Sequence, residues 1–286
     1  MAGTLYLVAT PIGNLGDVTL RALEVLKAVR AIVAEDTRRT RVLCERYQLG
    51  APLLSMPAFR EAAQARGLVD RLAAGEDLAL VTDAGSPGIS DPGTTLVQAA
   101  IAAGVRVVPI PGPSAAIAAL SASGLSTDRF FFAGFLPRKG PPRERSLALL
   151  KRLPATLVLY ESPERLAATL RELVQALGDR RAVVARELTK VHEEFARGTL
   201  SELAAHFEGQ VRGEIALLIE GAQEAESERA TDEAIRGEVL RRLAAGEGSV
   251  KEIAREIAEA TGRPRSEVYA IALRARAAPG CSDAQD

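Results

Sequence analysis

The sequence predicts an α/β protein with two α/β domains and a small C-terminal helical module, and three observations support this prediction. Apolar runs of four to six residues alternate with segments of helical periodicity as far as Glu220. Most of these runs end in loops that are rich in glycine, proline and charged residues. Beyond Gly221 the remaining periodic segments are all helical. At 286 residues, with 47% hydrophobic residues, the chain is long enough to bury more than one core.

The first domain is expected to span residues 1–124 and to contain a parallel sheet. Four apolar runs predict its strands, at residues 4–9, 31–34, 78–81 and 105–110. Helices are predicted between the strands, because residues such as Ala22, Val25, Leu26 and Val29 have the i, i+3, i+4, i+7 spacing of one buried face. Strands that alternate with helices form parallel sheets with right-handed crossovers, so the carboxyl ends of these strands share one edge.

The second domain, residues 125–224, is expected to be mixed α/β and to close over the first. Its predicted strands begin at Phe130 and continue at residues 156–160, 182–185 and 214–219. A charged linker at 222–229 leads to a helical module at 230–280, with helices at 231–245 and 250–260 and a third that begins at Pro264. The short turn at Thr261 and Gly262 suggests a helix-turn-helix. Such modules bind proteins as well as nucleic acids, so both kinds of partner remain open.

One loop, VTDAGSPGISDPG at residues 81–93, is the strongest candidate for a ligand site. It follows a predicted strand, and its glycines allow positive φ and let a ligand approach backbone N–H groups. Open α/β sheets bind their ligands at this edge. Asp83 and Asp91 make a phosphate ligand unfavourable and suit an ammonium group, a sulfonium or hydroxyls. The alternative is a tight turn with a purely structural role.

Composition and missing motifs exclude several classes of protein. The net charge of -1 gives no sign of a polyanion partner at the level of the whole chain. Two cysteines far apart, Cys44 and Cys281, indicate a reducing compartment and no metal site. The N-terminus begins with a strand, and no apolar run reaches membrane-spanning length, so we expect a cytoplasmic protein with no membrane contact. The P-loop, GxGxxG, HExxH and GxSxG motifs are absent from their required positions, and His192 and His206 are interpreted as spectators.

Charged residues follow several of the predicted strands and could carry chemistry. Asp36, Glu187 and Lys190 each lie at a strand end, where a raised carboxylate pKa or a desolvated lysine would suit a general base. An ion-pair network with Arg38, Arg39 and Arg186 is the alternative. A second basic loop contains Arg138, Lys139, Arg143 and Arg145, which indicates either a solvated loop or contact with a polyanion.

Taken together and in order, these segments resemble a known family. TPIGNLGD, AEDTRRT, TDAGSPGISDPG, PGPSA, GFLPRKG, ESPER and ARELTKVHEE are similar to segments of the ribosomal RNA small subunit methyltransferase I family, within the tetrapyrrole methylase superfamily of class III methyltransferases. The resemblance runs from Thr4 to about Glu220, and the helical appendage is of the family's type. Thr82 stands where serine was expected, and both residues carry a hydroxyl.

The resemblance implies an enzyme that uses S-adenosylmethionine to methylate the ribose 2'-oxygen of a cytidine in 16S rRNA of the small ribosomal subunit, and that forms a homodimer. It places the cofactor in a cleft between the two α/β domains. The cofactor-binding residues it implies are Pro11, Asp83, Ala84, Gly85, Ser86, Ile89, Ser114, Ala115, Tyr160, Gly213, Glu214 and Ile215. The RNA-binding residues are Arg38, Arg39, Arg138, Lys139, Arg143 and Arg186, and the catalytic candidates remain Asp36, Glu187 and Lys190.

Two other functions remain open at the level of the sequence. One is a methylase of the same fold that acts on a tetrapyrrole precursor, although the basic loops and the helical module argue against it. The other is a ligand sensor without enzymatic activity, with the helix-turn-helix as its output.

Overall fold

The computed structural model describes residues 2–222, 232–261 and 263–277. Contacts divide the chain into two compact units, Met1–Gly221 and Ala222–Asp286. Apart from Ala222, the expected linker at 222–229 lies outside the described residues, as do Thr231, Gly262 and Cys281. Within the described part of the chain, no helix combines the length and apolar character needed to cross a membrane.

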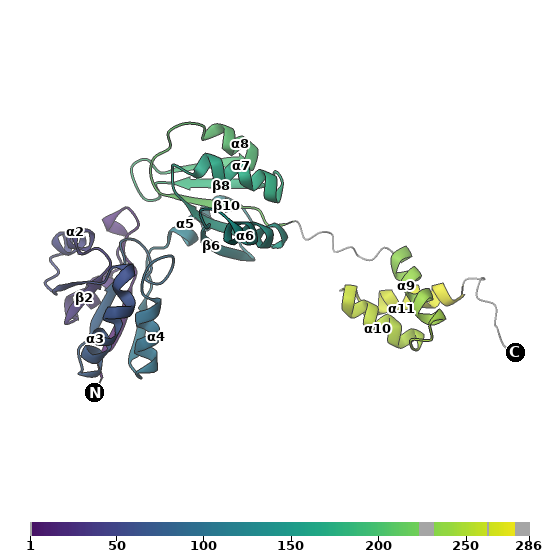
Figure 1. Cartoon of the computed structure of the whole chain (residues 1–286), viewed down its shortest axis with the longest axis horizontal. Coiled ribbons are helices and arrows are strands. Elements are labelled where there is room, and N and C mark those ends of the chain that lie inside the picture. The colour runs from purple at the N-terminus through teal and green to yellow at the C-terminus, as the bar shows by residue number, and fades with distance from the viewer. Residues whose placement is uncertain (1, 223–231, 262, 278–286) are drawn as a thin grey trace. The chain divides into compact units, whose positions relative to one another are not determined.

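The first sheet, of which β2 is labelled in Figure 1, contains five parallel strands in the order β3-β2-β4-β1-β5. The strands are β1 (Thr4–Val8), β2 (Ala31–Ala34), β3 (Leu53–Ser55), β4 (Leu78–Val81) and β5 (Arg106–Ile110). The four longer strands and their parallel pairing confirm the prediction from the sequence. The edge strand β3 was not predicted, because three residues are too few to show a periodic pattern.

Helices cover both faces of this sheet and explain its buried apolar runs. On one face, Leu26 and Leu43 pack with Ile32 and Val81, which places α1 (Leu20–Ala28) and α2 (Thr37–Tyr47) there. The other face holds α3 (Glu61–Ala73) and α4 (Thr94–Ala102). Two short 3-10 helices, Leu15–Asp17 and Ala58–Arg60, lie in the connections.

The second sheet is mixed, with strand order β6-β7-β10-β8-β9. Its strands are β6 (Phe130–Phe135), β7 (Thr156–Glu161), β8 (Arg181–Arg186), β9 (Glu194–Thr199) and β10 (Ile215–Ile219). Strands β6 and β7 are parallel, and the other neighbours pair antiparallel. Strand β9 was missed from the sequence, because EFARGT combines charged, small and aromatic residues without an apolar stripe.

One face of the second sheet packs on α6 (Pro141–Arg152), α7 (Leu166–Leu177) and α8 (Leu200–His206) around a core of buried leucines. The other face packs on α5 (Ala115–Ser123), which is labelled beside this sheet in Figure 1. Its Ala119 and Leu120 lie in one core cluster with Val158 and Leu218. Helix α5 follows a strand of the first sheet in the chain and covers the second sheet. The start of α5 therefore lies where both sheets can contribute to one site.

The direction of β10 gathers polar residues at one edge of the second sheet. Because β10 runs antiparallel to β7 and β8, its first residue, Ile215, pairs with the last residues of both neighbours, Glu161 and Arg186. The residues just before Ile215 consequently lie beside those that follow β7 and β8.

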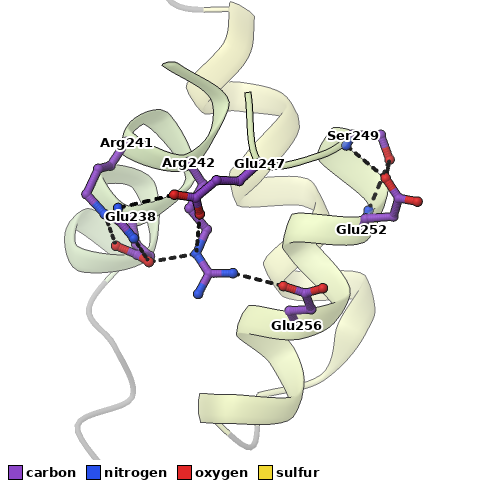
Figure 2. Close-up of polar contacts among 7 residues, drawn as sticks. All are labelled: Glu238, Arg241, Arg242, Glu247, Ser249, Glu252 and Glu256. Carbon is purple, nitrogen blue, oxygen red and sulfur yellow. Dashed lines mark hydrogen bonds and ion pairs between the residues drawn. The ribbon is translucent and has the colours of Figure 1, made fainter. Parts of the chain in front are cut away.

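The described residues of the C-terminal unit form three helices, α9 (Asp232–Ala244), α10 (Val250–Thr261) and α11 (Arg265–Ala277). Ile235, Val239, Ile253 and Val268 pack in its core. A capping box starts α10: the Glu252 N–H donates to Ser249 Oγ over 3.3 Å, and the Ser249 N–H donates to Glu252 Oε2 over 2.9 Å (Figure 2).

Candidate functional site

A cavity of about 350 Å³ lies in the unit Met1–Gly221, at the edge where the strand ends of both sheets gather. The first sheet contributes Ile12 after β1 and the loop after β4, and the start of α5 contributes Ser114 and Ala115. The second sheet contributes the ends of β6 and β7, Leu188 after β8, and the start of β10. The volume lies in the range typical of small-molecule and cofactor sites.

Nine of the twelve cofactor-binding candidates line this cavity: Ala84, Gly85, Ser86, Ile89, Ser114, Ala115, Tyr160, Glu214 and Ile215. Pro11, Asp83 and Gly213 do not appear in its lining. The cavity is also lined by residues outside the twelve candidates: Ile12, Ser90, Asp91, Phe135, Glu161, Ser162, Pro163, Leu188 and Ala216. Of these, Ser90 and Asp91 belong to the loop at 81–93 that the sequence singled out as a ligand site. Most of these adjoin predicted residues, so the motifs located the site better than they located each side chain.

The loop after β4 is held in place by its own backbone. The Thr10 N–H donates to the Gly85 carbonyl over 2.9 Å, and the Gly85 N–H donates back over 3.0 Å. The N–H groups of Gly88 and Ile89 donate to Pro92 and Ser86 within the loop. The expectation that the loop's N–H groups face a ligand is therefore wrong for these three residues, because their hydrogen bonds fix the loop itself.

Asp91 brings a carboxyl group with an altered pKa to the cavity wall. Burial, followed by repulsion from the charges of Glu35 and Asp83, raises the pKa of Asp91 to about 6. Burial and the charge of Asp83 also raise the pKa of Glu35, and Glu35 Oε2 is buried with no hydrogen-bond partner among the described residues. This part of the site therefore favours a positively charged group or a hydroxyl donor.

Tyr160 and its neighbours form an aromatic section of the wall. Its ring centre lies 5.1 Å from that of Phe132 and 5.6 Å from that of Phe135. Burial raises the pKa of the Tyr160 hydroxyl. This section offers a flat apolar surface beside the acidic group of Asp91.

Asp36 does not have the properties expected of a general base. It caps α2 by accepting the Arg38 N–H over 2.9 Å, and its carboxylate also pairs with the Arg38 guanidinium over 2.7 Å. The hydrogen bonds from Arg38 lower the pKa of Asp36 to about 2, which argues against the predicted catalytic role. Asp83 accepts the Asp36 N–H and pairs with Arg39, so it holds this loop to the neighbouring one.

The other two catalytic candidates form an ion-pair cluster beside the cavity. Lys190 Nζ lies 2.8 Å from Glu187 Oε1 and 3.0 Å from Glu214 Oε2, and Glu214 lines the cavity. Burial alone would lower the pKa of Lys190, but hydrogen bonds to both carboxylates outweigh it and raise the pKa. Lys190 is therefore held as a cation, contrary to the idea of a desolvated neutral lysine.

Two glycines allow the loops around this cluster to approach closely. A Cβ at Gly213, where φ is +94°, would overlap with the Glu187 side chain, and a Cβ at Gly13 would lie 2.8 Å from the Leu188 carbonyl oxygen. Glu187 and Thr189 both have positive φ, at 53° and 66°, a region that residues other than glycine rarely occupy. Gly213 therefore supports the site by making room for Glu187 and not by lining the cavity.

The candidate RNA-binding residues fall into two groups. Arg138 and Lys139 are exposed, as are the side chains of Arg38 and Arg39. Arg186 is partly buried and pairs with Glu194 over 2.6 Å.

Arg143 is only 8% exposed, and the prediction that it contacts RNA is wrong. Its guanidinium pairs with Glu172 and donates to the Pro137 carbonyl over 2.8 Å, so it fastens the basic loop to α7.

Comparisons with known proteins agree with the fold. A family model for tetrapyrrole (corrin/porphyrin) methylases matches residues 4–204, and a model for the RsmI C-terminal HTH domain matches residues 230–276. The solved structure of uroporphyrin III C-methyl transferase from Thermus thermophilus superposes with a TM-score of 0.57 at 20% identity, covering 76% of this chain and 97% of that chain. A second structure of the Thermus enzyme, complexed with S-adenyl homocysteine, gives the same TM-score of 0.57.

The fold and its matching family model define a tetrapyrrole methylase, a class III methyltransferase fold. Ribosomal RNA small subunit methyltransferase I of Synechocystis sp. is 47% identical over 277 residues, covering 96% of this chain and 99% of that protein. The protein of the same name from Escherichia coli O157:H7 is 44% identical, covering 95% of each chain. The chain belongs to the ribosomal RNA small subunit methyltransferase I family.

The buried position of Arg143 leads to a stability prediction. Replacing Arg143 with Gln should lower the free energy of unfolding by roughly 1–3 kcal/mol, because Glu172 and the Pro137 carbonyl lose their charged donor. Replacing the exposed Arg138 with Gln should change the same quantity by less than about 0.5 kcal/mol. Urea unfolding of both variants checks this, and equal stabilities would contradict the structural role of Arg143.

Proposed function

We propose that this protein transfers a methyl group from S-adenosylmethionine to the ribose 2'-oxygen of a cytidine in 16S rRNA of the small ribosomal subunit. The observation that carries the proposal is the cavity lined by the strand ends of both sheets, in a chain that matches the tetrapyrrole methylase family model. This chain is 44–47% identical, over nearly its full length, to ribosomal RNA small subunit methyltransferases I. We also propose that it acts in the cytoplasm as a homodimer.

The residues around the cavity fit S-adenosylmethionine. Asp91 supplies a carboxylate for the positively charged part of the cofactor, and the N-terminus of α5 at Ser114 and Ala115 suits its carboxylate. Tyr160 and Phe135 give an apolar surface for the adenine ring. The three candidates outside the cavity lining have supporting roles. Pro11 adjoins the Thr10–Gly85 bridge, and Asp83 accepts a hydrogen bond from the Asp36 N–H. Gly213 leaves room for the Glu187 side chain.

The cofactor supplies an activated methyl group, so the protein must align the ribose oxygen with it and assist loss of the hydroxyl proton. Lys190 is a cation fixed between Glu187 and Glu214 beside the cavity. We assign to Lys190 the stabilisation of negative charge that develops on the 2'-oxygen. Glu187 then positions Lys190, and the hydroxyl proton passes to solvent.

The exposed cations of two loops are the proposed contacts to the RNA backbone. Arg38 and Arg39 lie at the start of α2, and Arg138 and Lys139 lie after β6, so both loops follow strand ends. We assign Arg186 an indirect role in RNA binding, because its ion pair with Glu194 fixes the end of β8. A target nucleotide must leave its base stack for its 2'-hydroxyl to reach the cavity, as in other recognition of single-stranded RNA.

The first test is methyl transfer by the unaltered protein. With labelled S-adenosylmethionine and small ribosomal subunits that lack the modification, we expect label in a 2'-O-methylated cytidine of 16S rRNA. Nuclease digestion and separation of the nucleosides identify the product. Tight cofactor binding without label in RNA would contradict the ribosomal assignment and favour a small-molecule acceptor.

The pKa of Asp91 predicts how cofactor binding depends on pH. A positive ligand binds the ionised carboxylate best, so affinity for S-adenosylmethionine should be constant above pH 6 and fall by up to about tenfold per pH unit below it. Replacing Asp91 with Asn should weaken binding and remove this dependence. Isothermal titration calorimetry on both sides of pH 6 measures both effects. Glu24→Gln is the control, because Glu24 is exposed. An unchanged pH profile in the Asp91 variant would exclude this role.

Lys190 should affect the chemical step more than cofactor binding. Replacing it with Met should lower kcat by roughly 100-fold or more, the effect of losing one well-placed charge-stabilising donor. The Kd for S-adenosylmethionine should stay within about threefold of the original value, a small free-energy change. Lys151→Met, at an exposed position of α6, is the matched control. A large rise in Kd with little change in kcat would show instead that Lys190 serves to shape the cavity.

A further inference from the structure

The three helices of the C-terminal unit differ in how their basic residues are used. On α9, Arg241 and Arg242 both pair with Glu238, over 2.8 Å and 2.7 Å (Figure 2). Arg242 also reaches Glu256 on α10 over 2.9 Å. These contacts neutralise the two arginines and fasten α9 to α10, so this face of the unit has a structural role.

A groove between α10 and α11 is lined by other basic residues of this unit. Lys251 and Arg255 lie one turn apart on α10, and Arg265 begins α11; all three line the groove. Neither Lys251 nor Arg255 forms an ion pair with a described residue, although Arg255 lies within the electrostatic influence of Glu252. Glu252 also lines the groove, but Ser249 holds its carboxylate in the capping box.

An aromatic residue accompanies these cations. Tyr269 lines the groove and is 40% exposed, although its helix has a well-packed apolar side at Val268 and Ala272. It lies one turn after Arg265 on α11, so the ring and the guanidinium share a stripe of the helix. Cations next to an exposed ring are the combination with which proteins hold RNA strands, through phosphate contacts and base stacking.

We propose that this groove binds small-subunit ribosomal RNA, with Lys251, Arg255 and Arg265 at phosphates and Tyr269 stacked on a base. The proposal rests on the proposed function, because the RNA is the substrate named there. RNA is a better match than a protein partner, since three of the lining residues are cations and Glu252 is the one acidic residue among them. The C-terminal unit thereby provides a second RNA-binding surface in addition to the region around the cavity.

The test compares variants of the full chain in binding to 16S rRNA made by transcription, across a series of KCl concentrations. Replacing Lys251 and Arg255 together with Gln should reduce the slope of log K against log[salt] by roughly 1.4–1.8, the contribution of two phosphate contacts. Tyr269→Ala should weaken binding roughly fivefold or more and leave the slope unchanged. Arg236→Gln is the control, because Arg236 is exposed on α9 outside the groove.

Kinetics with small ribosomal subunits separate this proposal from the proposed function. The double variant should raise KM for the subunit and leave kcat and the Kd for S-adenosylmethionine unchanged, which also shows that it folds. An unchanged salt slope, or an equal change in Arg236→Gln, would overturn the RNA-binding groove even if the original enzyme methylates RNA. Weaker binding to assembled subunits with full affinity for free RNA would also overturn it and identify a protein contact. Failure of the original enzyme to methylate RNA would instead refute the proposed function.

Discussion

The pair of backbone hydrogen bonds between Thr10 and Gly85 is the constraint on which the site depends. It joins the turn after β1 to the loop after β4, two segments far apart in the chain. Thr10 adds a side-chain bond to the Thr82 carbonyl over 3.1 Å. With Gly85 bonded to Thr10 and Gly88 bonded to Pro92, the loop presents side chains such as Asp91 to the cavity. The position of Asp91 in the wall is thus set by backbone geometry, which explains why its carboxyl remains there despite the cost of burial.

The carboxyl groups around this edge have been separated into different roles by their surroundings. Asp36 is a partly exposed helix cap whose pKa is held at about 2 by Arg38, whereas Asp91 is half-buried near other acids and has a pKa of about 6. Glu187 is ionised beside Lys190, which lowers its pKa. The same chemical group, a carboxyl, therefore caps a helix at Asp36, holds a cation at Glu187 and is proposed to meet a positive ligand at Asp91. The charges and hydrogen bonds around each carboxyl decide which role it can take.

Much of the fold could be predicted from the sequence because its signals are local. The buried strands are short apolar runs, and the loop at 81–93 carries its own glycines, so both the parallel sheet and the position of the cavity could be inferred. The role of Arg143 could not, because its partner Glu172 is 29 residues away in the chain. Lys190 pairs with Glu187, three residues before it, but its second partner, Glu214, comes close only through the antiparallel placement of β10.

The close approach of the loops also couples the two halves of the site. Gly13 follows the bridged residue Thr10 and packs against Leu188 and Lys190, so the turn after β1 touches the loop after β8 directly. Thr189, in that same loop, holds a positive φ that its own side chain disfavours. A strained segment keeps its shape only when its neighbours determine it. The turn after β1 therefore contacts both the loop after β4 and the loop that contains Lys190. We expect the proposed cofactor and acceptor sides of the cavity to be ordered together for this reason.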